Sequence, residues 1–216
     1  MINSSESKIR SQIVDTMCLL KKKNMNLGSE GNISVRYENG FFITPSATNP
    51  EVMRTTQIIF KRFDKVFKKD QQPSSEWRMH QYIYNQRTEI NAIVHCHSIW
   101  SSIVSCLREK IPSFHYMVAE IGGEDVKCSK YATFGTEQIA HNIVYALEKR
   151  KGCLISNHGQ ISIGKNLEDA LNLSFAIEKL SKQYYHCLLT NKTKLLSKKQ
   201  MSESVLKFEG YKDTKH

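Results

Sequence analysis

The chain has 216 residues, of which 40% are hydrophobic and 24% charged, and this length and composition are those of one soluble globular domain. No run of about 18 apolar residues could cross a membrane, and the N-terminus has no apolar signal core, so we expect a cytoplasmic protein whose six cysteines stay reduced. The formal net charge of +10 suits an anionic partner or a lysine-rich surface, but no nucleic-acid-binding signature accompanies it.

The first half of the chain alternates between helical and strand patterns. In order we expect a helix at 8–23, a glycine-rich loop at 27–32, strands at 33–37 and 41–43, a strand pair at 57–67 and a helix at 75–86. The first helix is amphipathic, because its apolar residues recur every three or four positions. The dipeptide Asn39-Gly40 between two alternating runs predicts a tight hairpin turn. A serine before the helix at 75–86 is expected to be its N-cap.

The second half continues the alternation. We expect a strand at 92–94, a helix at 98–107, a helix at 136–150, a strand, loop and strand over 153–163, and a helix at 166–190. The last helix has Asn166 as its expected N-cap, and its expected buried face consists of Leu173, Ile177, Leu180, Tyr184 and Leu188. Without regular βαβ spacing, this pattern favours a layered α/β fold with a mainly antiparallel sheet. Residues 1–216 should form a single domain with a basic C-terminal tail that can be mobile.

Three histidines stand where predicted strands end. His95 and His97 are two residues apart at the end of an apolar strand, so their side chains share one face. His158 follows a second apolar strand. Three neutral histidines with an open coordination position are typical of a catalytic zinc site. The pair by itself is equally compatible with ordinary core or surface histidines, and His80, on an apolar helix face, is interpreted as a packing residue.

Glu76 follows two serines at a predicted helix start. A glutamate there commonly compensates the helix dipole, but it could also be a general acid/base or a fourth metal ligand. Groups that could bind an anion occur at Ser74 and Ser75, at Gly31-Asn32 and in the loop 44–48. Loops are rich in such residues in general, so these segments alone do not define a site.

Seven motifs together carry more information than any one of them. They are G-x-x-G-N-I-S-V-R, I-T-P-S, P-S-S-E-W-R-x-H, V-H-x-H, H-Y-M, Y-A-T-F-G-T and H-G. In this order and spacing, from about residue 8 to residue 190, the chain resembles the class II aldolase/adducin family and, within it, the fuculose-phosphate aldolases. The resemblance implies a class II aldolase-like three-layer fold, in which helices cover a central, mainly antiparallel sheet. It also implies a homotetramer with shared active sites.

The resemblance further implies a role for each candidate residue. It implies one zinc ion per subunit, with the ligands His95, His97 and His158, and Glu76 as an acid/base that can also touch the metal. It implies a phosphate cradle of Gly31, Asn32, Ser46, Ser74 and Ser75. Further substrate contacts are implied for Thr44, Phe134 and the C-terminal Tyr211. Tyr116 corresponds to a tyrosine that reaches a neighbouring subunit's site and exchanges a proton with the aldehyde oxygen.

The implied reaction is cleavage of a small phosphorylated sugar, a ketose 1-phosphate, into dihydroxyacetone phosphate and a small aldehyde. L-fuculose 1-phosphate or a related deoxy-sugar phosphate would be the substrate. Zinc would stabilise the charge on the ketose fragment, and Glu76 would return a proton to its carbon. The chain departs from the family pattern at Ala47, where the aldolases usually have glycine, and at Glu30, where they have a small residue. Both lie beside the implied substrate site and leave the choice of substrate open.

Other activities occur on the same scaffold. Pentulose-phosphate 4-epimerases usually have aspartate at the position of Glu76, which argues against that reaction. Methylthioribulose-1-phosphate dehydratases share the glutamate and the zinc triad, but Tyr116 in H-Y-M favours an aldolase. A methylthio- or deoxy-pentulose-phosphate aldolase is compatible with Ala47 and Glu30. A non-catalytic, adducin-like binding module should have lost metal ligands, and none is lost here.

Overall fold

A six-stranded sheet in the order β3-β2-β1-β4-β6-β5 forms the centre of the molecule. The computed structural model describes residues 4–213, with side chains described for 4–208 and 210. The strands are β1 (Asn32–Tyr37), β2 (Gly40–Ile43), β3 (Ile59–Arg62), β4 (Ala92–Cys96), β5 (Gly152–Ile155) and β6 (Gly159–Gly164). Every neighbouring pair is antiparallel, which confirms the expected sheet.

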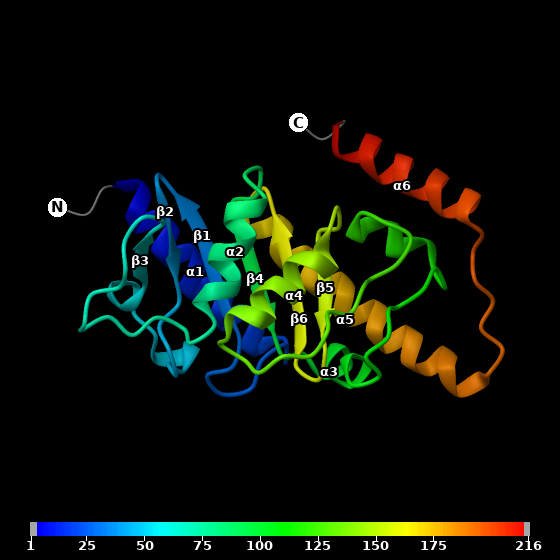
Figure 1. The fold of residues 1–216 in the computed structure, drawn as a ribbon, viewed down its shortest axis with the longest axis horizontal. Helices are drawn as coiled ribbons and strands as arrows, with labels where there is room; N and C mark the ends of the chain where they lie inside the picture. The colour runs from blue at the N-terminus through cyan, green and yellow to red at the C-terminus, as the bar shows by residue number, and fades with distance from the viewer. Residues whose placement is uncertain (1–3, 214–216) are drawn as a thin grey trace.

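Helices cover both faces of this sheet (Figure 1). They are α1 (Ser4–Lys22), α2 (Trp77–Gln86), α3 (Ile99–Ser105), α4 (Glu137–Leu147), α5 (Leu167–Thr190) and α6 (Lys198–Asp213). Because side chains alternate along a strand, Ile93 of β4 packs with α2 and α4 while Val94 packs with α1. The result is the expected arrangement of three layers, with the sheet in the middle.

The structure corrects three local expectations. Residues 57–67 contain one strand, β3, instead of two, because β3 lies at the sheet edge and pairs only with β2 before the chain turns at Arg62. The N-cap of α2 is Glu76; the hydroxyl of Ser74 accepts a hydrogen bond from the Glu76 N–H at 3.3 Å. Leu188 is 36% exposed, since α5 extends beyond the core there. By contrast, Asn166 caps α5 as expected, accepting from the Asp169 N–H at 2.8 Å.

Most of the expected basic tail is helix α6. This helix packs against the 3-10 helix η3 (Tyr116–Ile121), and Met201 is buried in the cluster that joins α3, α5 and η3. Val205 and Phe208 pack on the same cluster. These few apolar positions lie among many lysines and polar residues, and that composition does not predict a helix from the sequence.

Candidate active site and metal centre

The four candidate metal ligands come from three separate parts of the sheet and its covering helices. His95 lies in β4 and His97 just after it, His158 lies in the turn between β5 and β6, and Glu76 immediately precedes α2. Pairing of β4 with β6 brings the two histidine segments together. The approach is so close that a Cβ added to Gly159 would lie 2.5 Å from the carbonyl oxygen of Cys96, so this position needs glycine.

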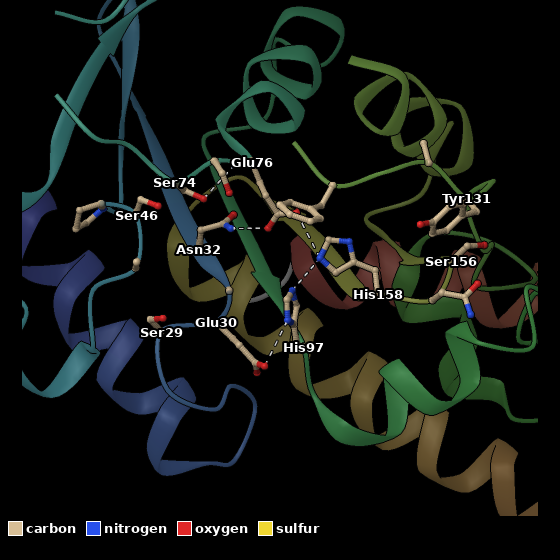
Figure 2. Close-up of a pocket in the computed structure, with 17 residues that line it drawn as sticks. Ser29, Glu30, Asn32, Ser46, Ser74, Glu76, His97, Tyr131, Ser156 and His158 are labelled. Atoms are coloured by element: carbon tan, nitrogen blue, oxygen red, sulfur yellow. Dashed lines mark hydrogen bonds and ion pairs between the residues drawn. The ribbon is translucent and has the colours of Figure 1, made fainter. Parts of the chain in front are cut away.

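The donor atoms of these side chains converge. The Nε2 atom of His97 lies 3.0 Å from Nε2 of His95 and 2.8 Å from Nε2 of His158. Glu76 contributes Oε2 at 3.1 Å from His95 Nε2 and Oε1 at 3.3 Å from His158 Nε2. One ligand atom from each of the four residues lies within 4.8 Å of the others. Figure 2 shows Glu76, His97 and His158 pointing toward one another.

This donor set fits a divalent metal ion. Nδ1 of His95 lies 2.8 Å from the backbone oxygen of Gln160 and donates to it, which leaves the Nε2 lone pair facing the cluster. Oε1 of Glu76 is buried and, apart from its ion-pair contact with His158 Nε2, makes no hydrogen bond among the described residues. Three imidazole nitrogens and a carboxylate oxygen around one point are the ligands that zinc and related ions bind.

The electrostatics favour neutral imidazoles at two of the three histidines. Burial and the charge of His95 lower the pKa of His97 to about 3 and that of His158 to about 4. Burial also opposes the charged form of His95, but the Glu76 carboxylate outweighs it and raises the pKa of His95. Burial would raise the pKa of Glu76, yet the charge and hydrogen bond of His95 bring it well below its ordinary value. The carboxylate is therefore ionised beside the histidines.

A second layer of polar side chains lies behind Glu76. Asn32 Nδ2 donates to Glu76 Oε2 at 3.0 Å, and Asn32 Oδ1 lies 2.5 Å from Nε2 of His80. His80 Nδ1 is 2.7 Å from the hydroxyl of Ser34, which is 2.9 Å from the hydroxyl of Tyr84. His80 is thus buried in polar contacts and is not the packing residue that its apolar sequence neighbours indicated.

A cavity of about 460 Å³ opens beside the cluster, and Glu76, His97 and His158 are part of its wall. The five residues predicted for the phosphate cradle all line it: Gly31, Asn32, Ser46, Ser74 and Ser75. Two loops meet there through backbone hydrogen bonds. The Ser46 N–H donates to the carbonyl oxygen of Gln72 at 2.9 Å, and the Ser74 N–H donates to the carbonyl oxygen of Thr44 at 3.0 Å. Hydroxyl and amide groups from three chain segments therefore surround one side of the cavity.

The other predicted substrate contacts are placed differently. Phe134 lines the cavity and is 65% exposed. Thr44 is buried, and its hydroxyl accepts from the Ile33 N–H at 3.2 Å, so the structure does not bring it to the cavity wall. Tyr131, which the sequence analysis did not single out, lines the cavity from the same Y-A-T-F-G-T motif as Phe134.

Neither of the two predicted tyrosines is found among the described residues that line the cavity. Tyr116 begins η3, is 54% exposed and is not among the residues that line the cavity. Its ring stacks on His115 and lies 6.4 Å from the ring of Phe208 in α6. Tyr211 belongs to α6, but its side chain lies outside the described residues.

Both departures from the family pattern are part of the cavity wall. Ala47 has a φ of 48°, a left-handed conformation that favours glycine. Glu30 accepts from the Leu27 N–H at 3.0 Å through Oε2, while its Oε1 lies 3.9 Å from Nδ1 of His97. Figure 2 shows Glu30 extending toward His97 on the side away from Glu76.

Comparison with known proteins agrees with this geometry. Residues 11–185 match the family described as Class II Aldolase and Adducin N-terminal domain. The chain belongs to this family. It is 37% identical over 205 residues to the 5-methylthioribulose-1-phosphate/5-deoxyribulose-1-phosphate aldolase of Rhodospirillum rubrum, over 95% of this chain and 93% of that protein. It is also 37% identical over 206 residues to the L-fuculose phosphate aldolase of Escherichia coli K12, over 95% and 96%.

A solved structure of an L-fuculose 1-phosphate aldolase has the same fold, with a TM-score of 0.90 and 31% identity over 97% of this chain and 98% of that one. The expected family and fold are therefore confirmed, and the chain is an enzyme of the class II aldolase type, a lyase. Class II aldolases depend on a metal ion, and the Glu76 and histidine cluster could hold one. Among residues 4–213, no helix is both long and apolar enough to cross a membrane.

Proposed function

We propose that this enzyme cleaves a ketose 1-phosphate into dihydroxyacetone phosphate and a small aldehyde, with a zinc ion as its metal. The observation that carries the proposal is the ionised, buried carboxylate of Glu76, which lies against three converging histidines at a cavity rich in hydroxyl and amide groups. L-fuculose 1-phosphate and 5-deoxy- or 5-methylthio-ribulose 1-phosphate are the candidate substrates, because relatives named for each are 37% identical to the chain.

The substrate phosphate would bind to the predicted cradle of Gly31, Asn32, Ser46, Ser74 and Ser75. Ser74 and Ser75 lie three and two residues before α2, close to a helix start whose dipole and backbone N–H groups favour an anion. The hydroxyl of Ser74 already accepts from the Glu76 N–H, so its own proton is directed to another acceptor such as a phosphate oxygen. Anchoring the phosphate fixes the carbon–carbon bond that breaks relative to Glu76.

His95, His97 and His158 would hold the ion, with Glu76 as a further candidate ligand. When bound, the ion supplies Lewis-acid stabilisation of negative charge on the substrate oxygens. In cleavage Glu76 would first take up a proton from solvent in the cavity and give it to the carbon of the ketose fragment; in the synthetic direction the ionised carboxylate would remove it. Because Asn32 holds Oε2 of Glu76, Oε1 is the oxygen that exchanges this proton.

Tyr116 would exchange the proton of the aldehyde oxygen in the active site of a neighbouring subunit, within a homotetramer. Its exposure of 54% and its position outside its own chain's cavity wall support this assignment. A ring of four chains requires head-to-tail contacts that close, and each such contact could bring one Tyr116 to one metal centre.

A substrate panel tests the proposal. The zinc-loaded protein is incubated separately with L-fuculose 1-phosphate, 5-deoxyribulose 1-phosphate and 5-methylthioribulose 1-phosphate, and the products are identified by mass spectrometry and NMR. We expect dihydroxyacetone phosphate and the matching aldehyde from at least one of them. Loss of water from the substrate would instead assign a dehydratase, inversion at carbon 4 an epimerase, and no turnover of any of the three would contradict the proposal.

A further inference from the structure

Behind Glu76, helix α2 and strand β1 are joined by a row of hydrogen-bonded polar side chains. Glu76, His80 and Tyr84 are four residues apart, so they follow one face of α2 and the residue that caps it. Asn32 and Ser34 are two apart and share one face of β1. The five side chains alternate between helix and strand in the order Glu76, Asn32, His80, Ser34, Tyr84, with hydrogen-bonding atoms 2.5–3.0 Å apart.

The hydrogen bond from Asn32 Nδ2 to Glu76 Oε2 sets the direction of every other hydrogen bond in this row. A carboxylate can only accept, so Asn32 must turn Nδ2 toward Glu76 and Oδ1 toward His80. Oδ1 also accepts, so the proton of His80 is on Nε2, and Nδ1 must accept from the hydroxyl of Ser34. Ser34 in turn accepts from Tyr84. All four bonds therefore donate toward Glu76.

The environment keeps each group in the required protonation state. His80 is fully buried, and burial lowers its pKa to about 3, so the ring is neutral and has one N–H. Burial raises the pKa of Tyr84, which keeps its hydroxyl proton. A buried polar group is costly unless it is hydrogen-bonded, and an apolar residue would fill the place of His80 without that requirement. The row meets this requirement with four hydrogen bonds, an arrangement that apolar packing at the position of His80 would not need.

We infer that His80 is a positioning residue for Glu76: its Nε2–H locks the Asn32 amide so that Nδ2 holds Oε2 of the carboxylate, leaving Oε1 for the substrate proton. Without this lock the Asn32 amide can rotate and present Oδ1 to the carboxylate, which repels it. The inference rests on the proposed role of Glu76 as the acid/base. His80 itself does not touch the substrate cavity.

Two substitutions at His80 distinguish loss of its hydrogen bond to Asn32 from loss of its side-chain packing. His80→Leu fills the space but has no donor, and we expect kcat to fall roughly 10–100-fold, the usual effect of losing such a supporting partner, with zinc content and KM retained. In His80→Gln the side-chain amide can donate from a position close to that of Nε2, and we expect it to restore most of the lost kcat. Equal losses in both variants would overturn the inference.

A double-mutant cycle tests whether His80 acts through Glu76. In a Glu76→Gln background the acid/base is gone, so adding His80→Leu should lower kcat by less than twofold further. If His80→Leu lowers kcat by the same factor in both backgrounds, the positioning role is wrong although the proposed function stands. If Glu76→Gln alone keeps near-normal kcat, the acid/base assignment itself fails, and the positioning role fails with it.

Tyr84→Phe tests the other end of the same row. It keeps the inference testable if the His80 variants do not fold. It removes only one hydroxyl, so Ser34 loses its donor while the ring packing stays. We expect kcat to fall about 2–10-fold, the effect of one neutral hydrogen bond, and this loss should also disappear in the Glu76→Gln background. If Tyr84→Phe lowers kcat by the same factor in the Glu76→Gln background, the five side chains do not act together on Glu76.

Discussion

The metal centre and the Tyr116 surface differ in how much of their environment one chain provides. At the metal centre, the chain itself provides converging imidazoles, a buried carboxylate and a second layer of hydrogen bonds behind it. Around Tyr116, the ring stacks on His115 and lies 6.4 Å from the ring of Phe208, and the tyrosine is more than half exposed. The four candidate ligands of the first region all come from one chain, whereas the second region presents an exposed tyrosine whose proposed role needs a neighbouring subunit.

The two regions can therefore be tested in different oligomeric states of the protein. Residues whose partners lie within the chain should show their effect in any oligomeric state. A residue that faces outward should show its effect only in assembled protein, if the proposed homotetramer forms.

Removal of the metal should have the largest effect. Chelation of the protein, or His97→Ala, should abolish cleavage and release the bound zinc, measured by elemental analysis before and after treatment. Restoring zinc should restore activity to the chelated protein but not to the variant. Full activity in a verified metal-free sample would rule out the metal centre as the site of the reaction.

Glu76→Gln should have the next largest effect. The variant retains the shape of the side chain but cannot accept the substrate proton, so kcat should fall by about 10²–10⁴-fold. Zinc content, by elemental analysis, and substrate binding, by calorimetry, should be retained. Near-normal kcat would reduce Glu76 to a charge at the start of α2.

Subunit mixing should give a smaller, partial recovery of activity. His95→Ala lacks a metal ligand and Tyr116→Phe lacks the proposed proton donor, so each homogeneous protein should be poorly active. Dissociated and reassembled together, some contacts should pair an intact cluster with an intact tyrosine, and the steady-state rate should rise. Verified mixed oligomers with no gain would mean that Tyr116 serves its own chain or has no catalytic role.

Ala47→Gly should have the smallest effect, on stability. A left-handed conformation costs a non-glycine residue about 1–2 kcal/mol, and the greater freedom of glycine in the unfolded chain offsets part of that gain. We therefore expect the free energy of unfolding to rise by about 0.5–1 kcal/mol in chemical denaturation. Ala176→Gly, in the middle of α5, is the matched control and should destabilise by about 1 kcal/mol. Destabilisation in both would show that Ala47 is not strained.

Much of the centre of the fold could be predicted from the sequence, because the apolar run of β4 is fully buried and the apolar positions of α5 recur at helical spacing on its buried face. The convergence of His95 and His97, two of the candidate ligands, could be predicted because two histidines on one strand face must point the same way. The hydrogen bonds of His80 could not be predicted, since periodicity shows only that it faces the core. Its partners Asn32 and Ser34 lie more than 40 positions away and meet it where α2 lies against β1. The single strand β3 and helix α6 depend on edge position and on a few tertiary contacts, which local pattern does not encode.

The separation of the ligands along the chain has a consequence for folding. Glu76 and His158 are 82 positions apart (158 − 76), and the strands between them must pair before the four donors meet. The unfolded chain therefore has no preformed site, and binding of the ion adds to the folding free energy, by about 2.7 kcal/mol when the free ion is at 100 times its Kd. Metal uptake measured during refolding would therefore report when β4 pairs with β6. It would not report when α6 packs on η3.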